Sequence, residues 1–103
     1  MKLREIAHSR TGDKGNISNI SVIAYDQAQY KLIEKYVTAE RVKEFFSDMV
    51  QGKVVRYTLP NIGALNFVMY DALSGGVTRT LSLDIHGKSF SSALLNMEIP
   101  NKL

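Results

Sequence analysis

The sequence predicts an α+β domain: a two-layer sandwich with a mainly antiparallel sheet and helices packed on one of its faces. Strand-like and helix-like segments follow one another in the order β-β-α-α-β-β-(β)-α, without the strict alternation that a parallel sheet requires. The length of 103 residues suits one domain, residues 1–103. With 45% hydrophobic residues, the chain can bury one core.

Composition excludes several classes of protein. The chain has no cysteine, which rules out disulfides, zinc fingers, iron–sulfur clusters and thiol catalysis. Its longest apolar runs have four residues, whereas a membrane span needs about 20, and its start lacks the apolar core of a signal peptide. We therefore expect a cytoplasmic protein with no membrane partner. The net charge of +3 is scattered along the chain, as on an ordinary solvated surface.

Two strands with a polar loop between them are expected first. Residues 3–8 are predicted to form a short strand. Residues 9–16 contain no apolar residue and two glycines, which indicates a loop. Residues 17–25 are rich in β-branched residues and predict a strand that is buried on both faces near its end.

Two helices are expected next. Asp26 is predicted to open the first helix, with Tyr30, Ile33 and Val37 on one side. Thr38 is the expected N-cap of the second, and Gly52 its expected C-terminal cap. The second helix has the cleanest amphipathic pattern, at Val42, Phe45, Phe46, Met49 and Val50.

The second half of the chain predicts further strands and one last helix. Residues 53–59 alternate, and Pro60 ends that strand. Residues 65–73 are apolar on both faces, as in a central strand. After the break at residues 74–76, residues 77–83 permit another strand and residues 86–87 a turn. Apolar residues between 90 and 97 predict a short final helix.

A small set of large side chains is expected to fill the space between the two layers or to lie in an interface. The set packed against the sheet is Val42, Phe45, Phe46, Met49 and Phe90. The tyrosines expected in the core or in an interface are Tyr30, Tyr57 and Tyr70.

The polar loop is the strongest candidate for a binding site. Its two glycines allow backbone N–H groups to approach a ligand, and its two cations suit a phosphate or carboxylate. The candidate residues are Arg10, Thr11, Gly12, Asp13, Lys14, Gly15 and Asn16. The alternative is a tight turn between paired strands, in which Gly12 and Gly15 would adopt positive φ.

A second glycine-bearing loop also carries a cation at its edge. Its candidate residues are Gly75, Gly76, Thr78 and Arg79. A flexible hairpin end explains it equally well, and the sequence does not show whether it converges with the first loop. Catalytic residues stay unassigned, because a Walker sequence, a nucleophile elbow and a metalloprotease motif are all missing. We expect no cofactor and no metal, since the two histidines lack a nearby carboxylate cluster.

Several collinear blocks resemble the C-terminal domain of acyclic terpene utilisation (AtuA) proteins, over almost the whole chain. These blocks are residues 8–16, 19–24, 38–43, 59–67, 72–76, 87–88 and 97–100. The resemblance implies a ferredoxin-like fold without an iron–sulfur cluster, and a link to the catabolism of acyclic terpenes and branched acids as CoA thioesters.

The resemblance also bears on the site. The family pattern matches at Arg10, Gly12, Asp13, Lys14 and Gly15. Thr11 stands where serine is expected, which keeps the hydroxyl, and Ser74 stands where glycine is expected, which makes the second loop less permissive. In larger members this domain follows a long N-terminal domain. We therefore expect an accessory subunit that pairs with a separate large AtuA-like chain and takes a CoA-type or other anionic ligand.

Two alternatives come from other functional classes. The chain could be a homo-oligomeric structural module that uses an exposed sheet edge or the sheet face without helices. It could also bind single-stranded nucleic acid, because residues 12–15 have the Gly-x-x-Gly form of KH domains. We disfavour nucleic acid, since a KH loop is followed by a helix whereas the residues after Gly15 predict a strand.

Overall fold

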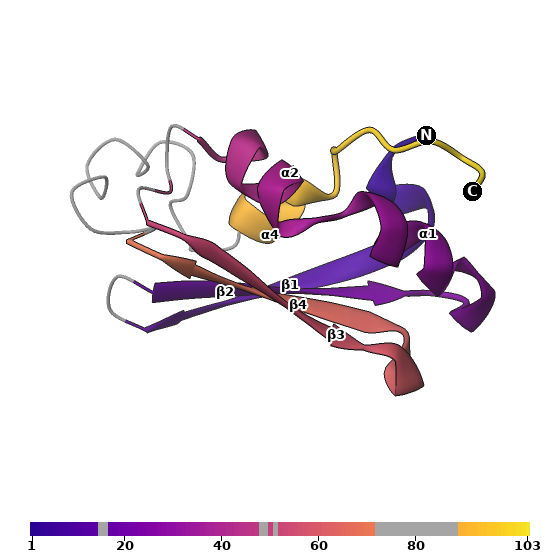
Figure 1. Ribbon diagram of the computed structural model, residues 1–103, viewed down its shortest axis with the longest axis horizontal. Coiled ribbons are helices and arrows are strands. Elements are labelled where there is room, and N and C mark those ends of the chain that lie inside the picture. The colour runs from indigo at the N-terminus through magenta and orange to yellow at the C-terminus, as the bar shows by residue number, and fades with distance from the viewer. Residues whose placement is uncertain (15–16, 48–49, 51, 72–88) are drawn as a thin grey trace.

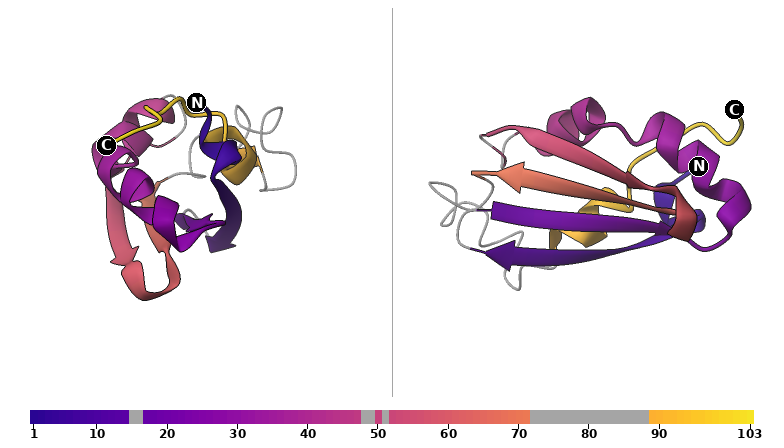
Figure 2. Two further views of the ribbon diagram at one scale, coloured as in Figure 1. Left: turned by 90° about the vertical axis from the view of Figure 1, so that its right-hand side faces the viewer. Right: turned by 60° about the horizontal axis from the view of Figure 1, so that its bottom comes forward.

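Four strands form one antiparallel sheet in the order β1-β2-β4-β3 (Figure 1). They are β1 (Ala7–Lys14), β2 (Ile17–Ala24), β3 (Val54–Leu59) and β4 (Ala64–Tyr70). The computed structural model describes residues 1–14, 17–47, 50, 52–71 and 89–103. The right-hand view of Figure 2 shows the strand order directly, with β1 and β3 at the edges.

In the described part of the chain, the helices cover one face of this sheet and none lies on the other. They are α1 (Tyr30–Tyr36), α2 (Ala39–Phe45) and α4 (Ser89–Leu94), and all lie on the same side (Figures 1 and 2). Short 3-10 helices occur at Leu3–Glu5, Gln27–Gln29 and Pro60–Ile62. This arrangement confirms the predicted α+β, ferredoxin-like sandwich.

The first strand begins later than the sequence predicts. Leu3–Glu5 is a 3-10 helix, and β1 runs from Ala7 through most of the predicted polar loop. Register explains the difference: β1 pairs with β2 along its whole length, from Ala7 opposite Ala24 to Lys14 opposite Ile17. In the described sheet β1 is an edge strand, and Arg10 on its open face is exposed, so this segment can form a strand without apolar residues.

Caps decide where the helices begin. The Asp26 carboxylate accepts the Ala28 N–H at 3.0 Å and starts the 3-10 turn that leads into α1. The Thr38 hydroxyl accepts the Arg41 N–H at 3.2 Å, which confirms Thr38 as the N-cap of α2. The predicted cap at Gly52 is wrong: α2 ends at Phe45, and the Gly52 N–H donates to the Tyr70 carbonyl at 3.0 Å.

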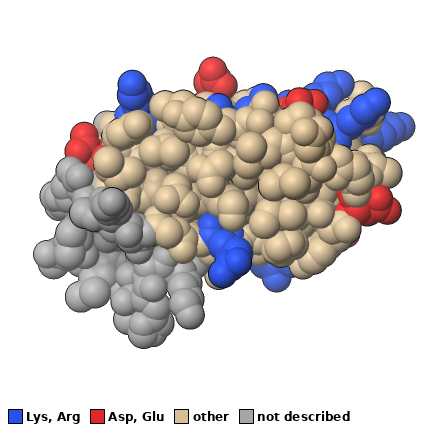
Figure 3. Space-filling view, turned by 90° about the horizontal axis from the view of Figure 1, so that it is seen from below, with Lys and Arg blue, Asp and Glu red and all other residues tan. Residues whose placement is uncertain are grey.

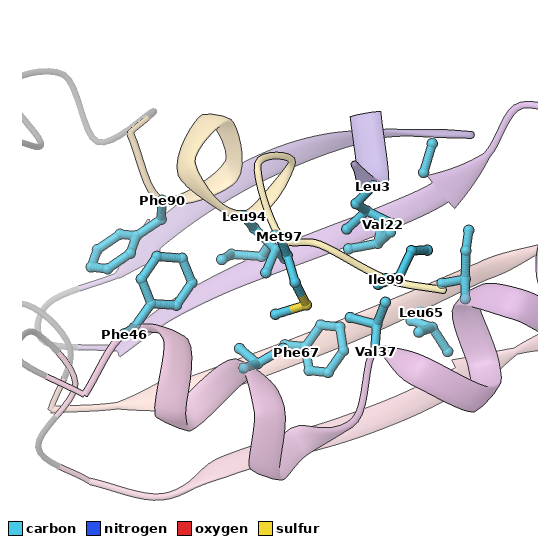
Figure 4. Packing of buried hydrophobic residues seen from close by; sticks show 14 of the residues in the cluster. Leu3, Val22, Val37, Phe46, Leu65, Phe67, Phe90, Leu94, Met97 and Ile99 are labelled. Atoms are coloured by element: carbon cyan, nitrogen blue, oxygen red, sulfur yellow. The ribbon is translucent and has the colours of Figure 1, made fainter. Parts of the chain in front are cut away.

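The core lies between the helices and the covered face of the central strands. Phe46 and Phe90 point toward each other edge to face, with ring centroids 5.1 Å apart (Figure 4). Phe67 of β4 and Ile20 of β2 are fully buried beneath the helical layer. The predicted last helix is shorter than expected, since α4 ends at Leu94, yet Met97 is buried in the same core.

One large side chain expected against the sheet differs from the prediction. Phe45 is 40% exposed, because only Phe46 of the pair turns toward the core. Tyr57 is 52% exposed on the sheet face that no described helix covers, so it is not a core residue, and its place in an interface stays a prediction. The expected strand at 77–83, the turn at 86–87 and the core position Met49 lie outside the described residues.

Two arginines hold the carbonyl end of α1. The Arg56 guanidinium, from the covered face of β3, donates to the carbonyls of Glu34 at 2.7 Å and Val37 at 3.0 Å. Arg41 of α2 donates to the Tyr36 carbonyl at 3.2 Å. The last carbonyls of a helix have no partner within the helix, so these cations satisfy them and fix α1 against β3.

Arg56→Ala is expected to lower the free energy of unfolding by about 1–2 kcal/mol, because it removes charge-assisted hydrogen bonds to helix-end carbonyls. Chemical denaturation measures the change. Lys31→Ala is the control, since Lys31 is an exposed cation on α1, the helix whose last carbonyls Arg56 binds. Equal stability of the two variants would show that the arginine contacts contribute nothing.

Tyr30 carries a buried phenol. Its side chain is 5% exposed, and its hydroxyl has no hydrogen-bond partner within the described part of the chain. Burial raises the pKa of Tyr30 above its ordinary 10.0, and the nearby Glu34 carboxylate adds to this. The fold therefore favours the neutral phenol. The contribution of the neutral Tyr30 phenol to the free energy of unfolding is complete below pH 10.0 and is lost as the pH rises further.

Tyr30→Phe is therefore expected to make thermal stability less sensitive to alkaline pH. Melting temperatures between neutral pH and a pH of about 11 measure this, because the unfolded-state phenol ionises near 10. Tyr57→Phe, which removes an exposed phenol, is the control. A Tyr30→Phe melting profile as steep as that of the unchanged chain would contradict the assignment.

Candidate functional site

The predicted polar site lies mainly on strand β1. Arg10, Thr11 and Gly12 are consecutive strand residues opposite Ser21, Ile20 and Asn19 of β2. Because side chains alternate across a sheet, Thr11 lies on the covered face, while Arg10 and Gly12 lie on the open face. The backbones of Asp13 and Lys14 continue β1. Gly15 and Asn16, and the whole second loop with Gly75, Gly76, Thr78 and Arg79, lie outside the described residues.

The structure therefore does not form a glycine cradle around residues 10–14. Gly12 sits in the β-ladder opposite Asn19, and its carbonyl accepts the Ser18 hydroxyl at 3.4 Å. Among the described glycines, positive φ occurs at Gly63 and not at Gly12. The hairpin continues into β2 rather than into a helix, so the geometry of a KH loop is not present at this point.

A hollow at the edge of β1 brings part of the predicted site together with residues from α4. Its volume is about 420 Å³, and it is lined by Ser9, Arg10, Thr11, Ser91 and Ser92. Four of these five residues carry hydroxyls, and the fifth is an exposed arginine. Arginine and hydroxyl groups are the donors that bind carboxylates and phosphates.

Contacts between β1 and α4 set the geometry of this hollow. The Ser91 N–H donates to the Thr11 Oγ1 at 3.0 Å, which ties the start of α4 to the edge strand. Ser91 is 7% exposed, so this contact is largely shielded from solvent. Beside it, the Ser9 Oγ is buried and has no hydrogen-bond partner among the described residues. A buried hydroxyl without a partner is costly.

Sequence reasoning found Arg10 and Thr11 but missed the three serines. Ser9 lies next to His8 in β1, and the two side chains lie on opposite faces of the sheet. Ser91 and Ser92 are separated from β1 by about eighty residues of sequence. The serine-rich start of α4, with serines at 89, 91 and 92, was the available signal.

A second hollow lies between α2 and β3 and has a volume of about 340 Å³. It contains both Glu40 and Lys43, and the Lys43 ammonium is already bound to the Gly52 carbonyl. Its charges are therefore mixed and partly engaged, which makes it a weaker anion site than the hollow at β1. Among all the residues that the structure describes, no group of three or more histidines, aspartates or glutamates is placed to hold a metal ion.

Comparison with known families identifies the domain. The family model of the AtuA ferredoxin-like domain matches residues 1–100. The chain belongs to this family. No curated protein and no solved structure matches it at a significant level. Within the described part of this AtuA ferredoxin-like domain, no helix has the length and apolar character to cross a membrane.

Gly12→Ala is expected to change the free energy of unfolding by less than about 0.5 kcal/mol. An added Cβ would lie 3.3 Å from the side-chain amide of exposed Asn19, which can move. Gly63→Ala is the contrast: with φ of 65°, it should cost about 1–2 kcal/mol. Denaturant titration of both variants tests this. A large loss of stability in Gly12→Ala would instead support the alternative that Gly12 lies in a tight turn with positive φ.

Proposed function

We propose that this AtuA ferredoxin-like domain is an accessory binding subunit in the catabolism of acyclic terpenoids or related acyl-CoA compounds, and that it acts with a larger AtuA-type chain. Its part is to bind an anionic group, a carboxylate or a phosphate of a CoA-type ligand, in the hollow at the edge of β1. Family membership supports the pathway class, and the composition of the hollow supports the ligand class.

The observation that carries this proposal is a hollow at the edge strand that is lined by Arg10, from the open face, and by four hydroxyl-bearing residues, of which Ser9 and Thr11 lie on the covered face. The guanidinium offers a planar pair of donors to an anion. The Ser9 hydroxyl is buried without a partner, and Ser92 is exposed at the opening. Together these groups can surround an oxygen-rich anion with one charge and several hydrogen bonds. Among the described residues that line the hollow, none carries a carboxylate that would repel it.

Thr11 already has a structural role on the covered face. Thr11 is engaged with the Ser91 N–H at 3.0 Å, so it positions α4, and its hydroxyl keeps donor capacity toward the hollow. We assign no bond-breaking step to these residues. The chemistry belongs to the complex with the larger chain, and the domain supplies recognition of the anionic group.

Arg10→Ala is expected to weaken binding of coenzyme A roughly ten- to hundred-fold, because a charge-assisted contact contributes about 1.5–3 kcal/mol. Isothermal titration calorimetry with coenzyme A measures the affinity. The melting temperature should scarcely move, since Arg10 is exposed.

Arg4→Ala is the matched control, because it removes the same charge from another exposed arginine. Equal loss of affinity in both variants would show only general attraction of anions to a basic protein. If Arg10→Ala binds coenzyme A as tightly as the unchanged domain, Arg10 is not part of the binding site. Ser9→Ala should weaken binding less than Arg10→Ala, since it deletes a neutral hydrogen bond.

A further inference from the structure

The outer side of β1 carries main-chain groups that the described sheet leaves unpaired. β1 is an edge strand, with β2 as its neighbour. The Tyr25 N–H donates to the Ile6 carbonyl at 2.9 Å, which makes these two residues a hydrogen-bonded pair that continues the register of β1 with β2. Such pairs alternate along an antiparallel ladder. Arg10 therefore bonds to β2, whereas the N–H and C=O groups of Ser9 and Thr11 point away from it.

These outward groups of Ser9 and Thr11, which we call the β1 edge, lie beside the hollow described above. Both residues line the hollow, together with Arg10 and with Ser91 and Ser92 of α4. The Ser91 N–H donates to the Thr11 side chain at 3.0 Å, so α4 flanks the strand without pairing with its main chain through this contact. Within the described ranges, the outward groups have no main-chain partner, and the hollow of about 420 Å³ leaves space next to them.

The β1 edge offers donors and acceptors in alternation. Ser9 and Thr11 each present one N–H and one C=O outward, and the two residues are about 7 Å apart along the strand. An ionised carboxylate has only acceptor atoms, so it could satisfy the N–H groups but not the carbonyls. An extended peptide has both kinds of group at the same spacing, and peptides bind exposed sheet edges by adding a strand. The main-chain groups therefore favour a peptide as the occupant of this edge.

Charge beside the β1 edge favours an acidic peptide. Arg10 lies between Ser9 and Thr11 in sequence, and its side chain is exposed on the open face. Alternate side chains of a strand added to this edge would share that face with Arg10. Among the described residues in the space-filling view of the open face, the acidic ones lie only toward the rim (Figure 3). A Glu or Asp of the peptide would therefore complement a cation of the domain.

Two other occupants fit the β1 edge less well. Antiparallel pairing of two copies of β1 through Ser9 and Thr11 would place both Arg10 side chains on one face of the joined sheet, opposite or diagonal to each other. Like charges in such positions destabilise a sheet. The phosphates of a nucleic acid would meet the outward carbonyls as well as the N–H groups, and two acceptors do not form a hydrogen bond.

We propose that the β1 edge binds an extended acidic peptide segment of another protein as an added antiparallel strand. The main chain of the peptide pairs with Ser9 and Thr11, and one Glu or Asp side chain contacts Arg10. Every described pair of strands in this sheet is antiparallel, and the added strand has the same direction. This peptide site goes beyond the proposed function, because it assigns a second class of ligand next to the same arginine.

Acetylated and amidated pentapeptides are the probe that tests the peptide site. One set carries Glu at the centre with Val, Thr or Ser at the other positions, and a matched set carries Lys at the centre. In two-dimensional NMR spectra of the isotope-labelled domain, a Glu-centred peptide should shift the amide signals of Ser9 and Thr11 and slow the hydrogen exchange of both amides. Lys-centred peptides should bind at least about ten-fold more weakly, because they place a cation against Arg10.

N-methylation of the peptide tests the main-chain contacts. When the central Glu is opposite Arg10, its own N–H points away from β1, and the residues on either side of it pair with Ser9 and Thr11. Methylation of the two flanking amide nitrogens should therefore abolish binding. Methylation of the Glu nitrogen should leave the affinity within about two-fold, because that N–H makes no contact with β1.

Reversal of one charge tests the contact with Arg10. Arg10→Glu should reverse the preference, so that Lys-centred peptides bind more tightly than Glu-centred ones. Arg4→Glu is the matched control, because it makes the same change at an exposed arginine outside β1. It should keep the preference for Glu-centred peptides, and melting curves confirm that both variants are folded.

Several outcomes would overturn the inference. If no Glu-centred peptide shifts Ser9 and Thr11, or if the flanking N-methyl groups do not weaken binding, the β1 edge is not a peptide site. The proposed function is decided separately, by the coenzyme A titration of Arg10→Ala. Protection of the two amides that grows with the concentration of the domain alone would identify a second copy. The same amide shifts with a single-stranded oligonucleotide, weakened steeply by salt, would identify a nucleic acid.

Discussion

Burial of one face of the two central strands is the constraint on which the rest of this structure depends. Ile20 and Val22 of β2 and Leu65 and Phe67 of β4 are completely buried beneath the helices. A strand that slipped by one residue would turn this entire set toward solvent, so the register is strongly fixed. The register in turn determines which residues of β1 meet α4 and which reach the open face.

The register also decides where the candidate site residues of β1 lie. The strand alternation places Ser9 and Thr11 toward α4, where a hydrogen bond to Ser91 holds the helix beside the hollow. It places Arg10 on the opposite face, in a row with Ser21, Asn66 and Tyr57. Arg10 also lines the hollow, because it stands on the edge strand of the described sheet.

Local sequence signals predicted the parts of the fold that depend on nearby residues. The Thr38 cap, the end of β3 at Pro60 and the buried positions of Val42 in α2 and of Phe46 at its C-cap are all confirmed. The failures have long-range causes. Residues 9–14 look like a loop because they contain no apolar residue, yet pairing with β2 makes them a strand. The sequence predicted Tyr57 in the core or in an interface, and only the position of the helices shows that it is not in the core.

The sequence by itself determined the α+β class and the family, and it predicted Arg10 and Thr11 as candidate site residues, because these depend on residue types and their local order. Only the tertiary structure showed that Ser9, Arg10 and Thr11 line one hollow with Ser91 and Ser92, and that the described helices all lie on one face of the sheet. The physical reason is that strand pairing and helix packing join residues far apart in the chain. Alternation in a single strand fixes two faces but does not say which of them the helices will cover.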